Sequence, residues 1–158
     1  MRETVRPCAR LEGELSPPGD KSVSHRAALF NAVAHGRATI THFSSGADCL
    51  STVECLRSLG ASIQAEPAED GSLRLVVQGG GAEGLREPDS VLDAGNSGTT
   101  MRLLCGLLAS RPFLTILTGD SSLRSRPMGR VIQPLRQMGA QIWGRGGDTL
   151  APLAIRGG

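Results

Sequence analysis

The chain has 158 residues, of which 39% are hydrophobic and 20% are charged, and its formal net charge is +2 at pH 7. This length suits one domain or two small ones, and so small a charge argues against nucleic acid or a membrane surface as the partner. Apolar runs stay below the roughly 18 residues that cross a bilayer, and residues 1–10 lack the apolar core of a signal peptide, so we expect a cytoplasmic protein.

In the first half of the chain, residues 4–15 predict a strand that the Pro17-Pro18-Gly19 run ends, because proline cannot continue a ladder. Residues 22–34 predict a helix, and residues 37–43 alternate like a strand. Asp48 is the predicted N-cap of a second helix that runs to Leu59. Residues 61–66 and 73–78 are then expected to pair as strands.

The second half repeats this order. It predicts helices over 98–109 and 129–138 and strands over 113–118, 140–143 and 150–156. Residues 56–63 (LRSLGASI) return as residues 135–142 (LRQMGAQI). A repeated unit has an apolar face that it cannot bury alone, so we expect neighbouring units around a shared core. Alternating helices and strands predict α/β layers.

Cysteine and histidine do not form metal-ligand patterns. The cysteines show no CxxC spacing and are expected to be reduced structural thiols: Cys8, Cys49, Cys55 and Cys105. The histidines are scattered and are expected to be structural or at the surface: His25, His35 and His42. We therefore predict no metal site.

Residues 18–26 (PGDKSVSHR) are the first segment that predicts chemistry. Lys21 and Ser22 open a helix, so backbone donors, the helix dipole, an ammonium and a hydroxyl converge there. Arg26 lies one turn along the same face. This arrangement favours an anion site. The alternative is a solvated helix start that Asp20 caps.

Residues 92–102 (LDAGNSGTTMR) are the second such segment. Gly95 and Gly98 allow the backbone to approach a ligand, Asn96 offers neutral hydrogen bonds, and Arg102 adds charge. Thr99 stands where a Walker A loop needs lysine, so this is not a nucleotide-binding P-loop. The alternative is a structural turn from strand to helix.

Residues 122–130 (SLRSRPMGR) are the third segment and contain Arg124, Arg126 and Arg130. Pro127 holds the backbone of Arg126 extended, which presents its guanidinium from a stiff loop. One arginine-rich turn is usually only solvated. Three cationic segments at helix openings in one small chain favour anionic ligands.

Together, the three segments resemble the 5-enolpyruvylshikimate 3-phosphate synthase family, in order and over essentially the whole chain. The resemblance implies an α/β (α+β) fold of repeated βαβαββ units, an inside-out α/β barrel arranged in lobes. About two of about six units are expected here, over residues 16–84 and 85–158. Residues 1–15 would be a strand that belongs to the other lobe.

The resemblance also implies an activity without metal or organic cofactor. The enolpyruvyl group of phosphoenolpyruvate moves to the 5-hydroxyl of shikimate 3-phosphate, and phosphate leaves. Lys21 would touch both substrates and take part in proton transfer, because an ammonium crowded by Arg126 releases its proton more readily. The other implied contacts are Ser22 and Arg26 with shikimate 3-phosphate, and Asn96, Gly98 and Arg126 with phosphoenolpyruvate. Gly98 also matches the family's glyphosate-contacting position.

The family's catalytic carboxylates are not matched in this chain. We interpret Asp48 as a helix cap and Asp93 as a turn residue at a strand end. Ser97 and Thr100 stand where better-known bacterial members often have alanine.

Other interpretations are open. The chain alone is expected to show no turnover, and it is then a segment that binds an anionic substrate, a complementary C-terminal fragment, or itself through apolar surface where a third unit would pack. The related transferase that acts on UDP-N-acetylglucosamine usually has Lys-Asn at the opening helix and a reactive cysteine, which residues 121–128 lack.

Overall fold

The computed structural model describes residues 3–4, 7, 9–15 and 17–158. Its longer helices are α1 (Lys21–Val33), α2 (Ala47–Ser58), α3 (Gly98–Leu108) and α5 (Gly129–Gln137). Short helical turns are η1 (Ala82–Gly84), α4 (Ser121–Arg124) and α6 (Arg145–Asp148). The strands are β1 (His35–Phe43), β2 (Ser62–Pro67), β3 (Leu73–Gly80), β4 (Leu92–Asp93), β5 (Leu114–Thr118), β6 (Gln141–Gly144) and β7 (Leu150–Arg156).

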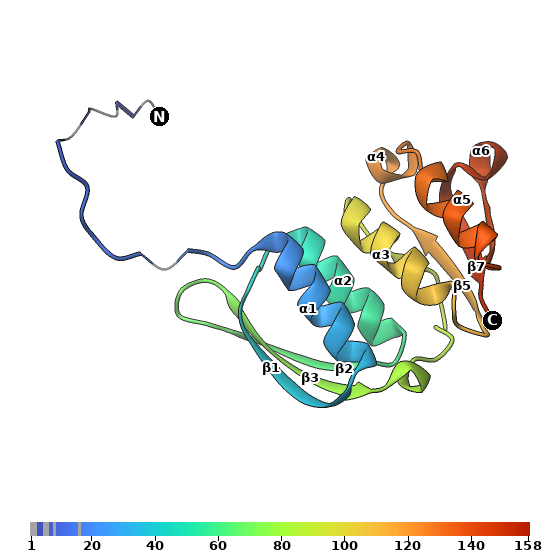
Figure 1. Ribbon diagram of the computed structural model, residues 1–158, viewed down its shortest axis with the longest axis horizontal. Helices are drawn as coiled ribbons and strands as arrows, with labels where there is room; N and C mark the ends of the chain where they lie inside the picture. The colour runs from blue at the N-terminus through green and yellow to red at the C-terminus, as the bar shows by residue number, and fades with distance from the viewer. Residues whose placement is uncertain (1–2, 5–6, 8, 16) are drawn as a thin grey trace.

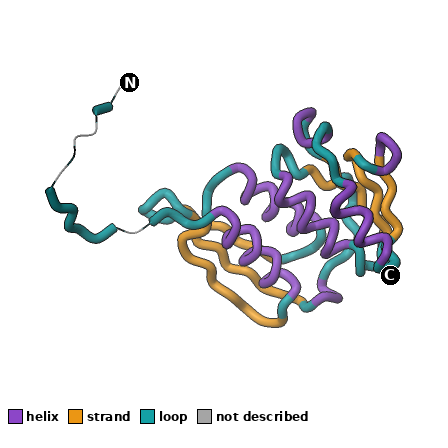
Figure 2. Tube along the Cα trace, turned by 45° about the horizontal axis from the view of Figure 1, so that its top comes forward, coloured by secondary structure: helices purple, strands orange, loops and turns teal. Residues whose placement is uncertain are grey.

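Two sheets lie under a layer of helices (Figures 1 and 2). The first sheet has the order β1-β3-β2 and carries α1 and α2, and the second has the order β4-β5-β7-β6 and carries α3 and α5. Strand β4 runs parallel to β5, whereas the other pairs are antiparallel. Helices α2 and α3 are in contact, and one cluster of buried side chains extends through both halves. This confirms the mixed fold of helices and sheets.

The repeated sequence builds the same helix ending in each half. Arg57 Nε donates to the carbonyl of Ile63 at 3.0 Å, and Arg136 Nε donates to that of Ile142 at 2.9 Å. The intervening Gly60 and Gly139 have φ of 95° and 103°, which only glycine adopts without strain. The repeat therefore specifies how a helix returns into its strand.

The described part of residues 4–15 does not form the strand that the sequence predicts; residues 5, 6 and 8 lie outside the description. Residues 9–15 are exposed and pair with neither sheet, and Leu11 and Leu15 are 89% and 81% exposed. A strand needs a partner for its backbone groups, and alternation in the sequence cannot supply one. Within the described residues, no helix is long and apolar enough to cross a membrane.

Candidate active site

The amino ends of α1, α2 and α3 lie at one end of the helical layer (Figure 1), and side chains connect them. Helix α1 is capped by Asp20, whose Oδ1 accepts the Val23 N–H at 2.7 Å. The cap leaves Lys21 as the first helical residue, and it orients the free N–H groups of the first turn.

Lys21 forms an ion pair with Asp48, which is 27 residues further along the chain. The prediction that Asp48 caps α2 is wrong, because Gly46 is the N-cap and Asp48 lies in the first turn with its carboxylate on the Lys21 ammonium. The Lys21 side chain is 55% exposed and that of Asp48 is 29% exposed. Asp48, rather than Arg126, is therefore the charged neighbour that Lys21 contacts.

Ser22 and Arg26 lie beside this pair on exposed positions of α1. Neither side chain makes a hydrogen bond or ion pair with another residue of the described segments. Their hydroxyl and guanidinium are consequently available to a ligand at the positive end of the helix.

Helix α3 begins with neutral groups instead of charged ones. Ser97 is its N-cap and accepts the Thr100 N–H at 3.2 Å. Before it, Asp93 Oδ1 accepts the Gly95 N–H at 2.8 Å, which confirms Asp93 as the turn residue at a strand end. Gly98 follows as the first residue of the helix.

The structure brings the predicted residues Asn96 and Arg126 into contact. Arg126 Nη2 donates to Asn96 Oδ1 at 2.5 Å and to Ser122 Oγ at 3.3 Å. Asn96 Nδ2 in turn donates to Asp120 Oδ2 at 2.6 Å. That bond and the Leu123 N–H hold the pKa of Asp120 below its ordinary value. The guanidinium of Arg126 is thus held by its edge beside the start of α3.

Gly98 is in close contact with two guanidinium groups. A Cβ placed on Gly98 would lie 2.7 Å from Arg102 Nη1 and 3.4 Å from Arg126 Nη1. The absence of a side chain at this position lets both cations approach the first turn of α3. A ligand anion there would meet backbone donors and guanidinium groups together.

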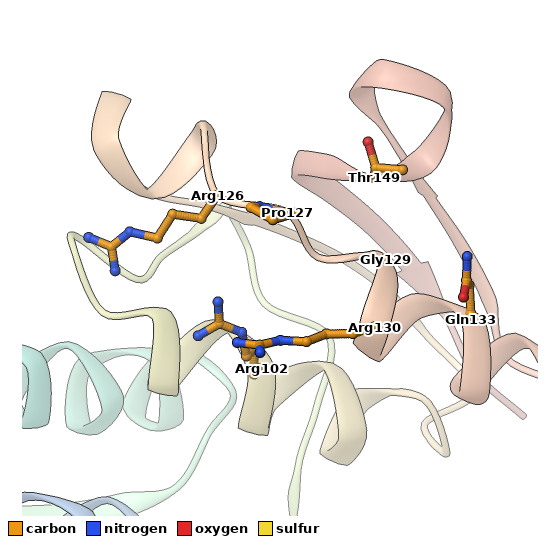
Figure 3. Close-up of a pocket in the computed structure, with 7 residues that line it drawn as sticks. All are labelled: Arg102, Arg126, Pro127, Gly129, Arg130, Gln133 and Thr149. Carbon is orange, nitrogen blue, oxygen red and sulfur yellow. The ribbon is translucent and has the colours of Figure 1, made fainter.

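A cavity of about 520 Å³ extends from this point between α3 and α5. It is lined by Arg102, Arg126, Pro127, Gly129, Arg130, Gln133 and Thr149 (Figure 3). Figure 3 shows the side chain of Arg130 reaching from α5 toward that of Arg102 on α3. None of the described residues that line this cavity is acidic, so its three guanidinium groups strongly attract an anion.

The other two guanidinium groups lie close enough to Arg102 to affect its pKa. Burial, and then the charges of Arg130 and Arg126, lower the pKa of the Arg102 guanidinium. Its Nε is buried and has no hydrogen-bond partner in the described structure. Three guanidinium groups held this close together, with Asp120 near Arg126 as the acidic neighbour, indicate a site prepared for a negatively charged ligand.

Sequence reasoning missed Asp120 and Ser122, which orient Asn96 and Arg126. The sequence does contain a signal for Asp120, because aspartate is a typical N-cap residue. Asp120 precedes the short helix α4 and caps it by accepting the Leu123 N–H. Among the described cysteines, Cys49, Cys55 and Cys105 are free and buried, whereas Cys8 lies outside the description. Burial raises the pKa of both Cys55 and Cys105 to about 12, as expected of structural thiols.

Residues 5–158 match the family model of EPSP synthase (3-phosphoshikimate 1-carboxyvinyltransferase). The 3-phosphoshikimate 1-carboxyvinyltransferase of Chloroflexus aurantiacus is 62% identical over 94% of this chain and 33% of its own length. That of Herpetosiphon aurantiacus is 57% identical over 99% of this chain and 35% of its own length.

A solved structure of EPSP synthase from Acinetobacter baumannii is also similar. It superposes with a TM-score of 0.84 at 46% identity, covering 92% of this chain and 32% of that protein. The present chain thus spans about a third of the length of the relatives that it matches.

Proposed function

The chain belongs to the EPSP synthase family, and on this premise we propose that its protein transfers the enolpyruvyl group of phosphoenolpyruvate to the 5-hydroxyl of shikimate 3-phosphate, with release of phosphate. The protein is then an enzyme of aromatic amino acid biosynthesis that works in the cytoplasm. No metal or organic cofactor enters the proposal.

The observation that carries the proposal is a pair of cationic sites at neighbouring helix starts. One consists of Lys21, Ser22 and Arg26 on α1, and the other of Gly98 with Arg126 and Arg102 around α3. Each substrate carries a phosphate and a carboxylate, so the protein must neutralise several negative charges before the two can meet. Backbone donors with guanidinium and ammonium groups are suited to that task.

The α1 site is assigned to shikimate 3-phosphate. Ser22 and Arg26 point outward without a partner among the described residues and would bind its phosphate. Lys21 would contact both substrates, and Asp48 fixes the direction of its ammonium. As the catalytic residue, Lys21 would pass a proton to or from the reacting groups.

The α3 site is assigned to phosphoenolpyruvate. Asn96 holds Arg126 in place, and Gly98 lets the ligand reach the first backbone N–H groups of α3. The adjoining cavity offers Arg102 and Arg130 as further positive charges.

The rest of the protein completes the enzyme in this proposal. The chain spans about a third of its relatives, and the described lining of the cavity between α3 and α5 contains no acidic residue. We therefore expect the 158-residue chain to bind anions but to need a complementary C-terminal part for turnover. Residues 1–15 would add a strand to the other lobe, and residues 16–84 and 85–158 would be successive units of one lobe.

Phosphate release is the test of this proposal. The full-length protein is mixed with phosphoenolpyruvate, with and without shikimate 3-phosphate, and inorganic phosphate is measured. We expect release only when both substrates are present. Release that does not need shikimate 3-phosphate, or no release at all from the folded full-length protein, would contradict the proposal.

A further inference from the structure

A continuous chain of buried hydrogen bonds lies beneath the candidate active site. His25 Nδ1 is 2.7 Å from Thr52 Oγ1, Thr52 Oγ1 is 2.7 Å from Thr100 Oγ1, and Thr100 Oγ1 is 2.7 Å from Ser97 Oγ. All four residues are 0% exposed. They come from α1, α2 and the start of α3, so the chain connects the three helix starts around the two proposed substrate sites.

Thr100 is the centre of this chain. Its Oγ1 is also 3.2 Å from the backbone oxygen of Asp48. A carbonyl oxygen can only accept, whereas the hydroxyls of Thr52 and Ser97 can also donate, so an arrangement that satisfies all three contacts assigns the single Thr100 proton to Asp48. The hydroxyls of Thr52 and Ser97 then donate to the two lone pairs of Thr100 Oγ1. In this arrangement every hydroxyl proton of the chain has an acceptor, as buried polar groups require.

The same arrangement of hydrogen bonds decides which ring nitrogen of His25 carries the proton. In that arrangement the Thr52 proton is used toward Thr100, so Thr52 Oγ1 accepts from His25 and the His25 proton is assigned to Nδ1. His25 Nε2 is buried and has no partner in the described structure. It is then a bare acceptor, which is a smaller cost than a buried N–H without an acceptor. Burial, and then the charge of Lys21, lower the pKa of His25, in agreement with a neutral ring.

We propose that, in this protein, Thr100 is a positioning residue for the proposed reaction, a role that family members with alanine at this position must fill by other contacts. Its hydroxyl fixes the backbone of Asp48, whose carboxylate holds the Lys21 ammonium. Thr100 lies two residues after Gly98 in the first turn of α3, so the helix backbone fixes the position of this hydroxyl relative to Gly98. Thr100 is fully buried, so it acts through these neighbours without touching a substrate. The hydroxyl thereby sets Lys21 relative to the backbone of the phosphoenolpyruvate site. This inference rests on the proposed function.

The kinetic test compares Thr100→Val, Thr100→Ser and Thr115→Val in the full-length protein. Valine keeps the shape of threonine and removes the hydroxyl, whereas serine keeps the hydroxyl. Thr115 on β5 is the matched control, because its Oγ1 is also buried but has no hydrogen-bond partner in the described residues. The thermal midpoint of each variant shows whether it is folded.

Thr100→Val is expected to lower kcat by about tenfold, because the Lys21 ammonium is then no longer held in position relative to the phosphoenolpyruvate site. Its KM for shikimate 3-phosphate is expected to change by less than about threefold, because Ser22 and Arg26 are untouched. Thr100→Ser should stay within about threefold of the parent in kcat, and Thr115→Val should equal the parent. A folded Thr100→Val with the parent's kcat, or a serine variant that loses as much as valine, overturns the proposal.

A nitrogen-15 NMR spectrum of the parent protein supplies the second readout. His25 is expected to be neutral with its proton on Nδ1, and a proton on Nε2 would overturn the arrangement around Thr100. If Thr100→Val does not fold, Thr100→Ala takes its place in the kinetic comparison, with the loss in kcat that is expected of Thr100→Val. A parent without turnover would end the proposed function, while the His25 spectrum would still decide whether this chain of hydrogen bonds exists.

Discussion

The starts of α1 and α3 hold their functional groups in opposite ways. At α1 the groups are exposed side chains, namely Lys21, Ser22 and Arg26. At α3 the hydroxyls of Ser97 and Thr100 are buried, and what faces the cations is the bare backbone of Gly98. The ends of the corresponding units are nevertheless alike, because Arg57 and Arg136 make the same bond to a strand carbonyl.

This difference separates the residues that specify the scaffold from those that specify the two proposed sites. The repeat specifies the scaffold at the helix ends, whereas the two helix starts differ in sequence and in the groups that they expose. At α1 we expect function to be lost when a side chain is removed. At α3 we expect it to be lost when a side chain is added, because a Cβ on Gly98 would meet Arg102 at 2.7 Å.

The largest effect is expected from removing the ammonium of Lys21. Lys21→Ala should lower kcat/KM of the full-length protein by about 10²–10⁴-fold, the usual contribution of a proton-transferring group. Arg37→Ala is the control, because Arg37 is an exposed cation on β1 outside the proposed sites. If steady-state kinetics gave Lys21→Ala the activity of the control, the catalytic assignment at α1 would be wrong.

Arg26 is expected to give a smaller effect, and on binding. Arg26→Ala removes a charge-assisted hydrogen bond to shikimate 3-phosphate, typically worth about 1.5–3 kcal/mol. Calorimetric titration with shikimate 3-phosphate should show this loss, and the parent's affinity should fall as salt rises. Equal affinity in the parent and Arg26→Ala would remove Arg26 from the site.

Adding a methyl group at Gly98 tests the α3 side of the comparison. Gly98→Ala should push Arg102 aside and narrow the approach to Arg126, at a cost of about 1–3 kcal/mol. Glyphosate is longer than phosphoenolpyruvate, so it should lose more affinity. The two quantities to compare are the inhibition constant of glyphosate and the KM for phosphoenolpyruvate. Equal losses would mean that Gly98 does not border the region where the two ligands differ.

Sequence periodicity predicted most of the long elements, because the helices and strands bury faces with the periods of 3.6 and 2 residues. The Gly-rich and arginine-rich segments, together with the family resemblance, selected Asn96 and Arg126, which are in contact. Sequence periodicity failed where structure depends on distant partners. Asp48 and Lys21 are 27 residues apart in the sequence, and no local sequence pattern predicts their contact. The short elements β4 and α4 have two and four residues, too few to show a period.

His25 joins α1 to Thr52 of α2, and its burial gives the stability of the protein a pH dependence. Burial, and then the Lys21 charge, lower the His25 pKa, while Asp48 opposes the shift. His25 therefore binds a proton more readily in the unfolded chain than in the folded one. The stability that the neutral, buried His25 allows is fully present above about pH 6.5, and it is lost as the pH falls through the pKa of His25 in the folded protein. Thermal unfolding of the parent and His25→Asn across this range should show the variant losing less stability on acidification. If the unfolding temperatures of the parent and His25→Asn fell in parallel with pH, the proposed role of His25 in this pH dependence would be contradicted.

The smallest effects are expected at the helix ends, where the two halves agree. Arg57→Ala and Arg136→Ala should each reduce the free energy of unfolding by about 0.5–1.5 kcal/mol for each hydrogen bond lost to a strand carbonyl. Arg57 donates one such bond to Ile63, and Arg136 donates two to Ile142. Urea unfolding measures both. Arg136 also pairs with Asp148, and Arg57 with Glu54, so each variant loses an ion pair as well as the carbonyl bond. Losses that differ several-fold would show that the repeat is not energetically equivalent.

The most direct test of the central claim is to map where each substrate binds. Backbone amide NMR signals of the full-length protein are followed during separate titrations with shikimate 3-phosphate and with phosphoenolpyruvate. We predict that shikimate 3-phosphate shifts the signals of Ser22 and Arg26, and that phosphoenolpyruvate shifts those of Asn96 and Gly98. If both substrates shifted only one of these helix starts, or neither, the assignment of the two anion sites to two substrates would be contradicted.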